Sequence, residues 1–97
     1  MMKKFCLIGS SFSALPLAER IVNYGHQLYV VGNKKNDPCH NFAHQSIFLD
    51  YSDINNTRKI EDINFDFVIP SSNDISYEFA EKLSKERSIE PLASRIS

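Results

Sequence analysis

The chain has 97 residues, which is enough for one small domain with a single hydrophobic core. Its formal net charge of −1 and charged fraction of 24% give no basic excess for binding nucleic acid or a membrane surface. Two cysteines do not form a disulfide framework, and the apolar run near the N-terminus is too short for a membrane span or a signal sequence, so we expect a cytoplasmic protein.

Strand and helix patterns alternate along the chain. Continuous apolar runs indicate strands that are covered on both faces, and apolar residues three and four apart indicate helices with one buried side. The predicted strands are residues 4–8, 26–32, 46–51 and 65–70. A polar loop with one helical turn near Phe42 and Ala43 follows the second strand. The predicted helices bury Ala14, Leu17, Ala18, Ile21 and Val22, then Ile54, Ile60 and Ile63, and finally Ile75, Phe79, Ala80 and Leu83.

Turn and capping residues lie at the expected ends of these helices. Pro16 fits the first turn of the first helix, where its missing N–H leaves no carbonyl unpaired, and Gly25 ends that helix. Asp53 can cap the second helix, and Asn73 or Asp74 can cap the third. Strands separated by helices require right-handed crossovers, so the expected fold class is α/β: a Rossmann-like open parallel sheet of about four strands with helices on both faces.

The expected fold alone predicts where a binding site lies, before any sequence motif is considered. Ligands of open parallel sheets bind beyond the carboxyl ends of the strands, where the strand order reverses. Polar loops at residues 9–13, 32–38 and 70–74 lie at that edge, and the first offers free N–H groups and a helix N-terminus to an anion. The candidate substrate- or anion-binding residues are Gly9, Ser10, Ser11, Phe12, Ser72, Asn73 and Asp74. Helix capping by Ser10 or Ser11, and by Asn73 or Asp74, is the structural alternative.

Two other kinds of loop share this strand–glycine–helix start. A dinucleotide site needs three glycines, and only Gly9 is present, with Ser11 where the pyrophosphate would approach. Lys34 and Lys35 could still meet a 2′-phosphate, so an NADP-type site stays open. A phosphocysteine loop needs an exposed thiolate, whereas Cys6 lies inside a strand and is expected to be buried.

Three possible metal ligands lie close together at Cys39, His40 and His44. Structural zinc takes four ligands, usually as two spaced pairs, and the sequence offers no second pair. We therefore expect these side chains to have structural roles, with no metal bound.

The order of features resembles the N-terminal domain of ATP-grasp ligases, also called the pre-ATP-grasp or biotin-carboxylase-like N-terminal domain, as in carbamoyl-phosphate-synthase-like enzymes. "KFCLIGSSFSALPLAERIVNYGHQLYVVG" is similar to the first strand, glycine turn, "PL"-bearing helix, "GH" break and second strand of that family. "DPCHNFAHQSIFLDYSD" is similar to its proline loop and short third strand, and "FDFVIPSSND" to its fourth strand and ligand-facing turn. The resemblance covers residues 3–87 and rests on the order in which these features follow one another along the chain.

The resemblance implies an ATP-dependent ligase in which ATP and Mg²⁺ phosphorylate a carboxylate and an amine then displaces phosphate from the acyl phosphate. This domain would hold a small carboxylate- or phosphate-bearing substrate, while domains absent from this chain bind most of the ATP. Residues 1–87 are then the pre-ATP-grasp domain, residues 88–97 begin a linker to the missing ATP-grasp region, and the isolated fragment is inactive.

Two further expectations concern partners. Apolar surface that normally meets the missing domains could pair two copies into a homodimer. The alternative function is a stand-alone Rossmann-like module that binds a nucleotide of the NADP type or a small anion.

Overall fold

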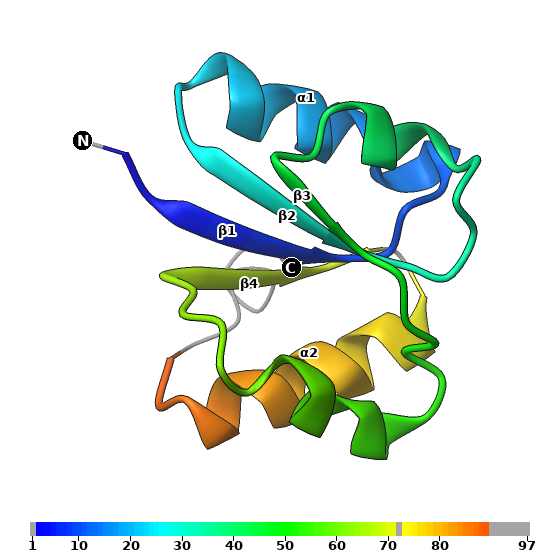
Figure 1. Cartoon of the computed structure of the whole chain (residues 1–97), viewed down its shortest axis with the longest axis vertical. Coiled ribbons are helices and arrows are strands. Elements are labelled where there is room, and N and C mark those ends of the chain that lie inside the picture. The colour runs from blue at the N-terminus through cyan, green and yellow to red at the C-terminus, as the bar shows by residue number, and fades with distance from the viewer. Residues whose placement is uncertain (1, 72, 90–97) are drawn as a thin grey trace.

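The computed structural model describes residues 2–71 and 73–89, which form a parallel sheet between two helical layers (Figure 1). The strands are β1 (Lys4–Ile8), β2 (Gln27–Val31), β3 (Gln45–Ile47) and β4 (Phe67–Pro70). The α-helices are α1 (Leu15–Asn23) and α2 (Asp74–Glu86), and the 3₁₀ helices are η1 (Phe12–Ala14), η2 (Pro38–Asn41) and η3 (Ile54–Ile60). The strand order is β3-β2-β1-β4, and all neighbours are parallel. The predicted α/β fold is confirmed.

The central strand β1 is covered on both faces, as its continuous apolar run predicts. Cys6 and Ile8 point into the core beneath α2, and Leu7 points into the core beneath α1. Figure 1 shows α1 on one side of the sheet and α2, with η3 beside it, on the other. The two cores make the sheet a rigid support for the loops at its carboxyl edge.

The residues that begin and end the helices lie where the sequence places them. Pro16 lies in the first turn of α1, and Gly25 follows that helix with a φ of 84°. Asp53 caps η3, and Asn73 caps α2 by accepting a 2.7 Å hydrogen bond from the Ser76 N–H. Within residues 2–71 and 73–89, no helix combines the length and apolar character needed to cross a membrane.

The third strand is shorter than predicted, because the chain leaves the sheet after Ile47. A tight turn follows, in which the Leu49 N–H donates to the Ile47 carbonyl at 3.1 Å. This turn sends Leu49 into the core and leaves Phe48 half exposed. The predicted strand over residues 46–51 is therefore wrong beyond residue 47. The fourth strand likewise begins at residue 67 rather than 65.

Two isoleucines predicted to be buried are exposed. Ile54 is 40% exposed, because η3 has 3₁₀ spacing and buries Thr57 and Ile60 while Ile54 lies at its open start. Ile75 is 48% exposed, because Ser76 takes the buried position in the first turn of α2. Burying this serine is possible because its hydroxyl donates to the carbonyls of Ser71 and of the cap residue Asn73.

Candidate functional site

The strand order reverses between β1 and β4, because β2 and β3 lie on one side of β1 and β4 lies on the other. In an open parallel sheet, this reversal opens a crevice between the loops that follow the two strands on either side of it. Here those loops start at Gly9, after β1, and at Ser71, after β4 (Figure 1). The site is therefore built from the loop after β1, with the loops after β2, β3 and β4 around it.

Gly9 and Ser71 pack directly against each other where these two loops leave the sheet, and this contact is the floor of the candidate site. Its φ is +123°, and its N–H donates to the Val31 carbonyl at 2.8 Å. A Cβ added to Gly9 would lie 2.4 Å from the Ser71 Oγ and 2.7 Å from the Ser71 Cβ. No side chain fits between the two loops here, so a ligand at this edge has to lie above the floor, against the turn from Ser10 to Phe12.

Ser10 is buried and is held by the loop after β2. Its hydroxyl donates to the Asp37 carboxylate at 2.7 Å, and its carbonyl accepts from the Cys39 N–H at 3.1 Å. A Cβ added to Gly32 would lie 2.2 Å from the Ser10 Oγ, so the loop after β2 passes directly against this residue. The Ser10 hydroxyl is used to fix the turn, and only its backbone N–H is left for a ligand.

Ser11 and Phe12 are exposed on top of the turn. Ser11 is the N-cap of η1 but makes no side-chain capping bond; its hydroxyl lies 3.0 Å from that of Ser13. The N-cap of α1 is Ala14, since η1 intervenes, so the capping alternative for the two serines is wrong. Among residues 2–71 and 73–89, no acceptor is present for the N–H groups of Ser10, Ser11 and Phe12. These amides can bind an anion.

The loop after β4 supplies one side of the site. Asn73 is the cap of α2, so the capping interpretation is confirmed for this residue, and its Oδ1 is occupied by the Ser76 N–H. Its Nδ2 lies 3.5 Å from the Tyr51 hydroxyl and keeps donor capacity. Asp74 is exposed in the first turn of α2, and the remaining candidate, Ser72, lies outside the described residues.

Sequence reasoning missed Tyr51, which brings the loop after β3 to the site. Its ring packs edge-on against Phe79 at 6.4 Å, and its hydroxyl lies 3.9 Å from the position of a Cβ added to Gly9. The hydroxyl therefore lies between Gly9 and Asn73 at the edge of the crevice. Tyr51 was assigned to the third strand; the signal that could have found it is a polar aromatic residue next to an acidic loop at the carboxyl edge.

The three possible metal ligands near η2 each hold the loop to the rest of the domain. Cys39 Sγ donates to the Ser11 carbonyl at 3.3 Å, His40 Nδ1 bonds the Ser46 hydroxyl at 2.8 Å, and His44 Nδ1 accepts from the Leu28 N–H at 3.0 Å. Their bonds run to three different parts of the fold. This arrangement gives each side chain a structural role.

Both cysteines are buried thiols. Burial raises the pKa of Cys6 far above its ordinary value, because the low-dielectric core disfavours the thiolate. Burial, reinforced by the Asp37 and Glu19 carboxylates, raises the pKa of Cys39 to about 11. The expectation that Cys6 is buried is confirmed, so the loop lacks the exposed thiolate of a phosphocysteine site.

No protein-family model matches the sequence, and no curated protein matches it. Solved structures do match. Phosphoribosylglycinamide synthetase from Anaerococcus prevotii aligns with a TM-score of 0.82 at 18% identity, over 91% of this chain and 23% of its own. An ADP complex of PurK, N5-carboxyaminoimidazole ribonucleotide synthetase, aligns with a TM-score of 0.71 at 25% identity, over 86% of this chain and 22% of its own. Both are ATP-grasp ligases. This chain has the pre-ATP-grasp fold.

An enzyme of another kind shares this fold. The Bordetella bronchiseptica enzyme WbmH, solved in complex with NAD⁺, aligns with a TM-score of 0.63 at 15% identity, over 92% of this chain and 37% of its own. The chain described here spans under a quarter of the length of the two synthetases. The fold alone does not determine which ligand binds. The assignment of a ligand therefore rests on the geometry of the turn that follows Gly9.

Proposed function

We propose that this chain is the substrate-side domain of an ATP-dependent carboxylate–amine ligase, and that the turn after Gly9 binds the carboxylate or phosphate group of a small substrate. The observation that carries the proposal is the set of open amides at Ser10, Ser11 and Phe12, on the floor made by Gly9 and Ser71. The similarity to two synthetases supports the ligase assignment.

The turn binds an anion through backbone donors. Successive N–H groups that point to one side form a concave site for negative charge, and η1 with α1 behind it adds the positive end of a helix dipole. The Ser11 hydroxyl adds a donor, while the Asp37 carboxylate beside Ser10 opposes a second negative charge. We therefore expect weak binding by the domain alone, with a Kd of about 1 mM, which corresponds to roughly 4 kcal/mol.

ATP and Mg²⁺ belong to the remaining domains of the proposed enzyme. The described part of the turn offers neither a lysine within it nor a cluster of three or more His, Cys, Asp or Glu side chains for a metal. When bound elsewhere in the enzyme, ATP would supply the phosphoryl group that activates the substrate carboxylate. The residues of this chain would bind and orient that substrate and exclude water from one side of it, so the isolated chain is expected to be inactive.

Nuclear magnetic resonance of the nitrogen-15-labelled chain tests the anion site. Inorganic phosphate and acetate are titrated separately, and the amide signals of Ser10, Ser11 and Phe12 are expected to shift together along a saturable curve. Ser11→Ala is expected to raise the Kd about threefold, since one hydroxyl donor is lost. The control is Ser88→Ala, which removes an exposed hydroxyl at the far end of α2 and should leave the Kd unchanged. Unmoved turn amides would refute the anion role.

The alternative of an NADP-type site has one observation in its favour, the similarity to an NAD⁺-binding enzyme. Lys34 and Lys35 are exposed in the loop after β2, where they could meet a 2′-phosphate. Ser11 argues against it, because a side chain stands where the pyrophosphate needs close backbone approach. Titration with NADP⁺ discriminates: the ligase domain predicts binding no tighter than that of phosphate, whereas an NADP site predicts micromolar binding that Lys34→Ala weakens.

A further inference from the structure

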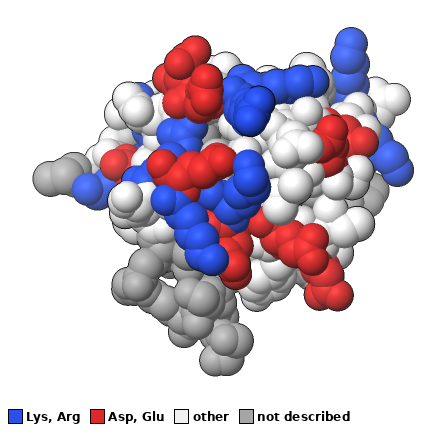
Figure 2. All heavy atoms as spheres, turned by 90° about the horizontal axis from the view of Figure 1, so that it is seen from below, with Lys and Arg blue, Asp and Glu red and all other residues white. Residues whose placement is uncertain are grey.

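The outer face of α2 carries a charge pattern that reverses at its midpoint. Glu78 and Glu81 precede the point between residues 81 and 82, and Lys82 and Lys85 follow it at matching distances. Residues three, four and seven apart share one face of a helix, so the four side chains form a single stripe. Figure 2 views the molecule from this side and shows acidic and basic side chains next to one another across it.

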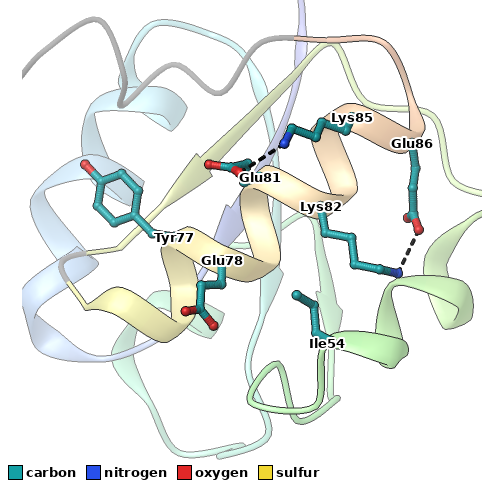
Figure 3. A pocket seen from close by; sticks show the side chains of 7 residues that line it. All are labelled: Ile54, Tyr77, Glu78, Glu81, Lys82, Lys85 and Glu86. Carbon is teal, nitrogen blue, oxygen red and sulfur yellow. Dashed lines mark hydrogen bonds and ion pairs between the residues drawn. The ribbon is translucent and has the colours of Figure 1, made fainter.

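Two exposed apolar side chains accompany the charged stripe. Tyr77 on α2 is 43% exposed, and Ile54 at the start of η3 is 40% exposed. Figure 3 shows them on either side of the helix, lining a groove of about 490 Å³ together with the charged residues. Among the described residues, nothing covers this groove. Its apolar side chains and the charged stripe are therefore exposed to solvent next to one another.

We propose that this face binds a second copy of the chain, with the two α2 helices antiparallel about a two-fold axis through the midpoint of the stripe. Antiparallel pairing sets Glu78 opposite the partner copy's Lys85, and Glu81 opposite its Lys82, and the symmetry repeats both pairs. Parallel pairing would set like charges opposite one another. A surface whose own charges are complementary under a two-fold rotation fits a second copy better than it fits a partner of one charge sign.

The charged side chains of the stripe reach the solvent, although three of them already take part in ion pairs within α2. The Glu81–Lys85 pair within the helix has an N–O distance of 3.2 Å, and its side chains stay 64% and 76% exposed. Lys82 pairs with Glu86 at 2.8 Å and donates to the Thr57 hydroxyl at 2.9 Å; its side chain is 34% exposed, and one of its three donors remains. Exposed pairs of this kind are individually weak, so each lysine can bridge carboxylates of both copies. This proposal is independent of the anion site, which lies at the carboxyl edge of the sheet.

The size of the face predicts a weak dimer. A helix of 13 residues is about 20 Å long, and one pair of such helices buries less than the roughly 1,200 Å² of a standard stable interface. We therefore expect a Kd of about 100 µM at low salt, and an increase of several-fold at about 0.5 M salt, where the cross-pairs are screened.

Sedimentation equilibrium over roughly 10 µM to 1 mM of the chain measures this association. The double variant Glu78→Lys with Glu81→Lys, and separately Lys82→Glu with Lys85→Glu, are each expected to weaken it at least tenfold. An equimolar mixture of the two variants is expected to associate at least as tightly as the natural chain, because one stripe is then wholly basic and the other wholly acidic. Tyr77→Ser should weaken the dimer several-fold, while the control Tyr24→Ser, at a 73% exposed site beside α1, should not.

Cross-linking tests the geometry of the pairing, with one of the two kinds of cross-pair, Glu78 with Lys85, left intact. Glu81→Cys places a thiol next to the two-fold axis, and the native cysteines are buried, so glutathione disulfide is expected to yield a disulfide-linked dimer. Glu61→Cys, an exposed position outside the stripe, is the control and should remain monomeric. A monomer throughout the concentration range overturns the proposal, as does a mixture of folded charge variants that fails to associate. Equal cross-linking of the two cysteine variants also overturns it.

Discussion

Replacing Gly9 with alanine tests whether the floor of the site is as closed as the structure shows. The new Cβ would lie 2.4 Å from the Ser71 Oγ, well inside van der Waals contact. Ser71 cannot move away easily, because it is buried and its N–H donates to the Ile8 carbonyl at 2.9 Å. The substitution therefore combines a clash with a backbone conformation that alanine disfavours, since the φ of Gly9 is +123°.

The two costs can be added and separated. The left-handed conformation costs roughly 1–2 kcal/mol, and overpacking a filled site costs about 1–3 kcal/mol more. Gly25→Ala is the matched control: its φ is +84°, but nothing lies within 4 Å of the added Cβ, so it pays only the conformational cost. Gly9→Ala should therefore lower the free energy of unfolding by about 3 kcal/mol, and the melting temperature by about 12 °C or more.

Urea unfolding followed by circular dichroism measures both variants. A double-mutant cycle with Ser71→Gly isolates the clash, because removing the Ser71 side chain should return about 1–3 kcal/mol to the Gly9→Ala chain without relieving the φ strain. Equal destabilisation by Gly9→Ala and Gly25→Ala, or no coupling with Ser71→Gly, would contradict the closed floor.

Three further outcomes are expected. Asn73→Ala should destabilise the domain by about 1 kcal/mol through loss of the α2 cap, whereas Asn73→Asp should cost a few tenths at most; equal losses in urea unfolding would argue against the cap. A hydrogen bond donated by Lys82 holds the pKa of Glu86 below its ordinary value, so the pair stabilises the fold above about pH 4.5 and loses this contribution as the pH falls through the lowered pKa. Acidification from about pH 6 to pH 3 should then cost the natural chain a few tenths of a kcal/mol more than Glu86→Gln, because the pair is partly exposed. Cys39 should resist iodoacetamide at pH 8 until urea unfolds the chain, since burial raises its pKa to about 11; fast native labelling would show the loop to be open.

Periodicity predicted the sheet because parallel strands are buried on both faces. The run at residues 4–8 matches β1 at both ends, and the caps of η3 and α2 were predictable because Asp53 and Asn73 are short polar side chains just before a buried pattern. The end of β3 could not be predicted from the sequence. Phe48, Leu49 and Tyr51 have high strand propensity, but β3 has one neighbour, and the core contact of Leu49 outweighs continued pairing.

The sequence predicted which loops gather at the carboxyl edge of the sheet, and less well which of their side chains are exposed. Parallel strands bring their carboxyl ends to one edge, so the loop at Gly9 could be placed there from the sequence. Which serine faces the solvent could not, because Ser10 and Ser11 are chemically alike. Only the close passage of Gly32 and the hydroxyl bond to Asp37 decide that Ser10 is buried. Ile75 and Ser76 illustrate the same limit, since hydrogen bonds to two carbonyls make the serine the buried residue.

The contact between Gly9 and Ser71 makes the floor of the candidate site rigid, so the selectivity of the site has to come from other surfaces. Two strand ends in direct contact cannot move apart to admit a ligand, so this floor keeps one shape. Any change of shape that fits the site to a ligand then has to come from the exposed Phe12 ring and from the surface that contacts this ring. In the proposed ligase, a change in the surface that covers the turn would then alter the preferred substrate without any change in the strands.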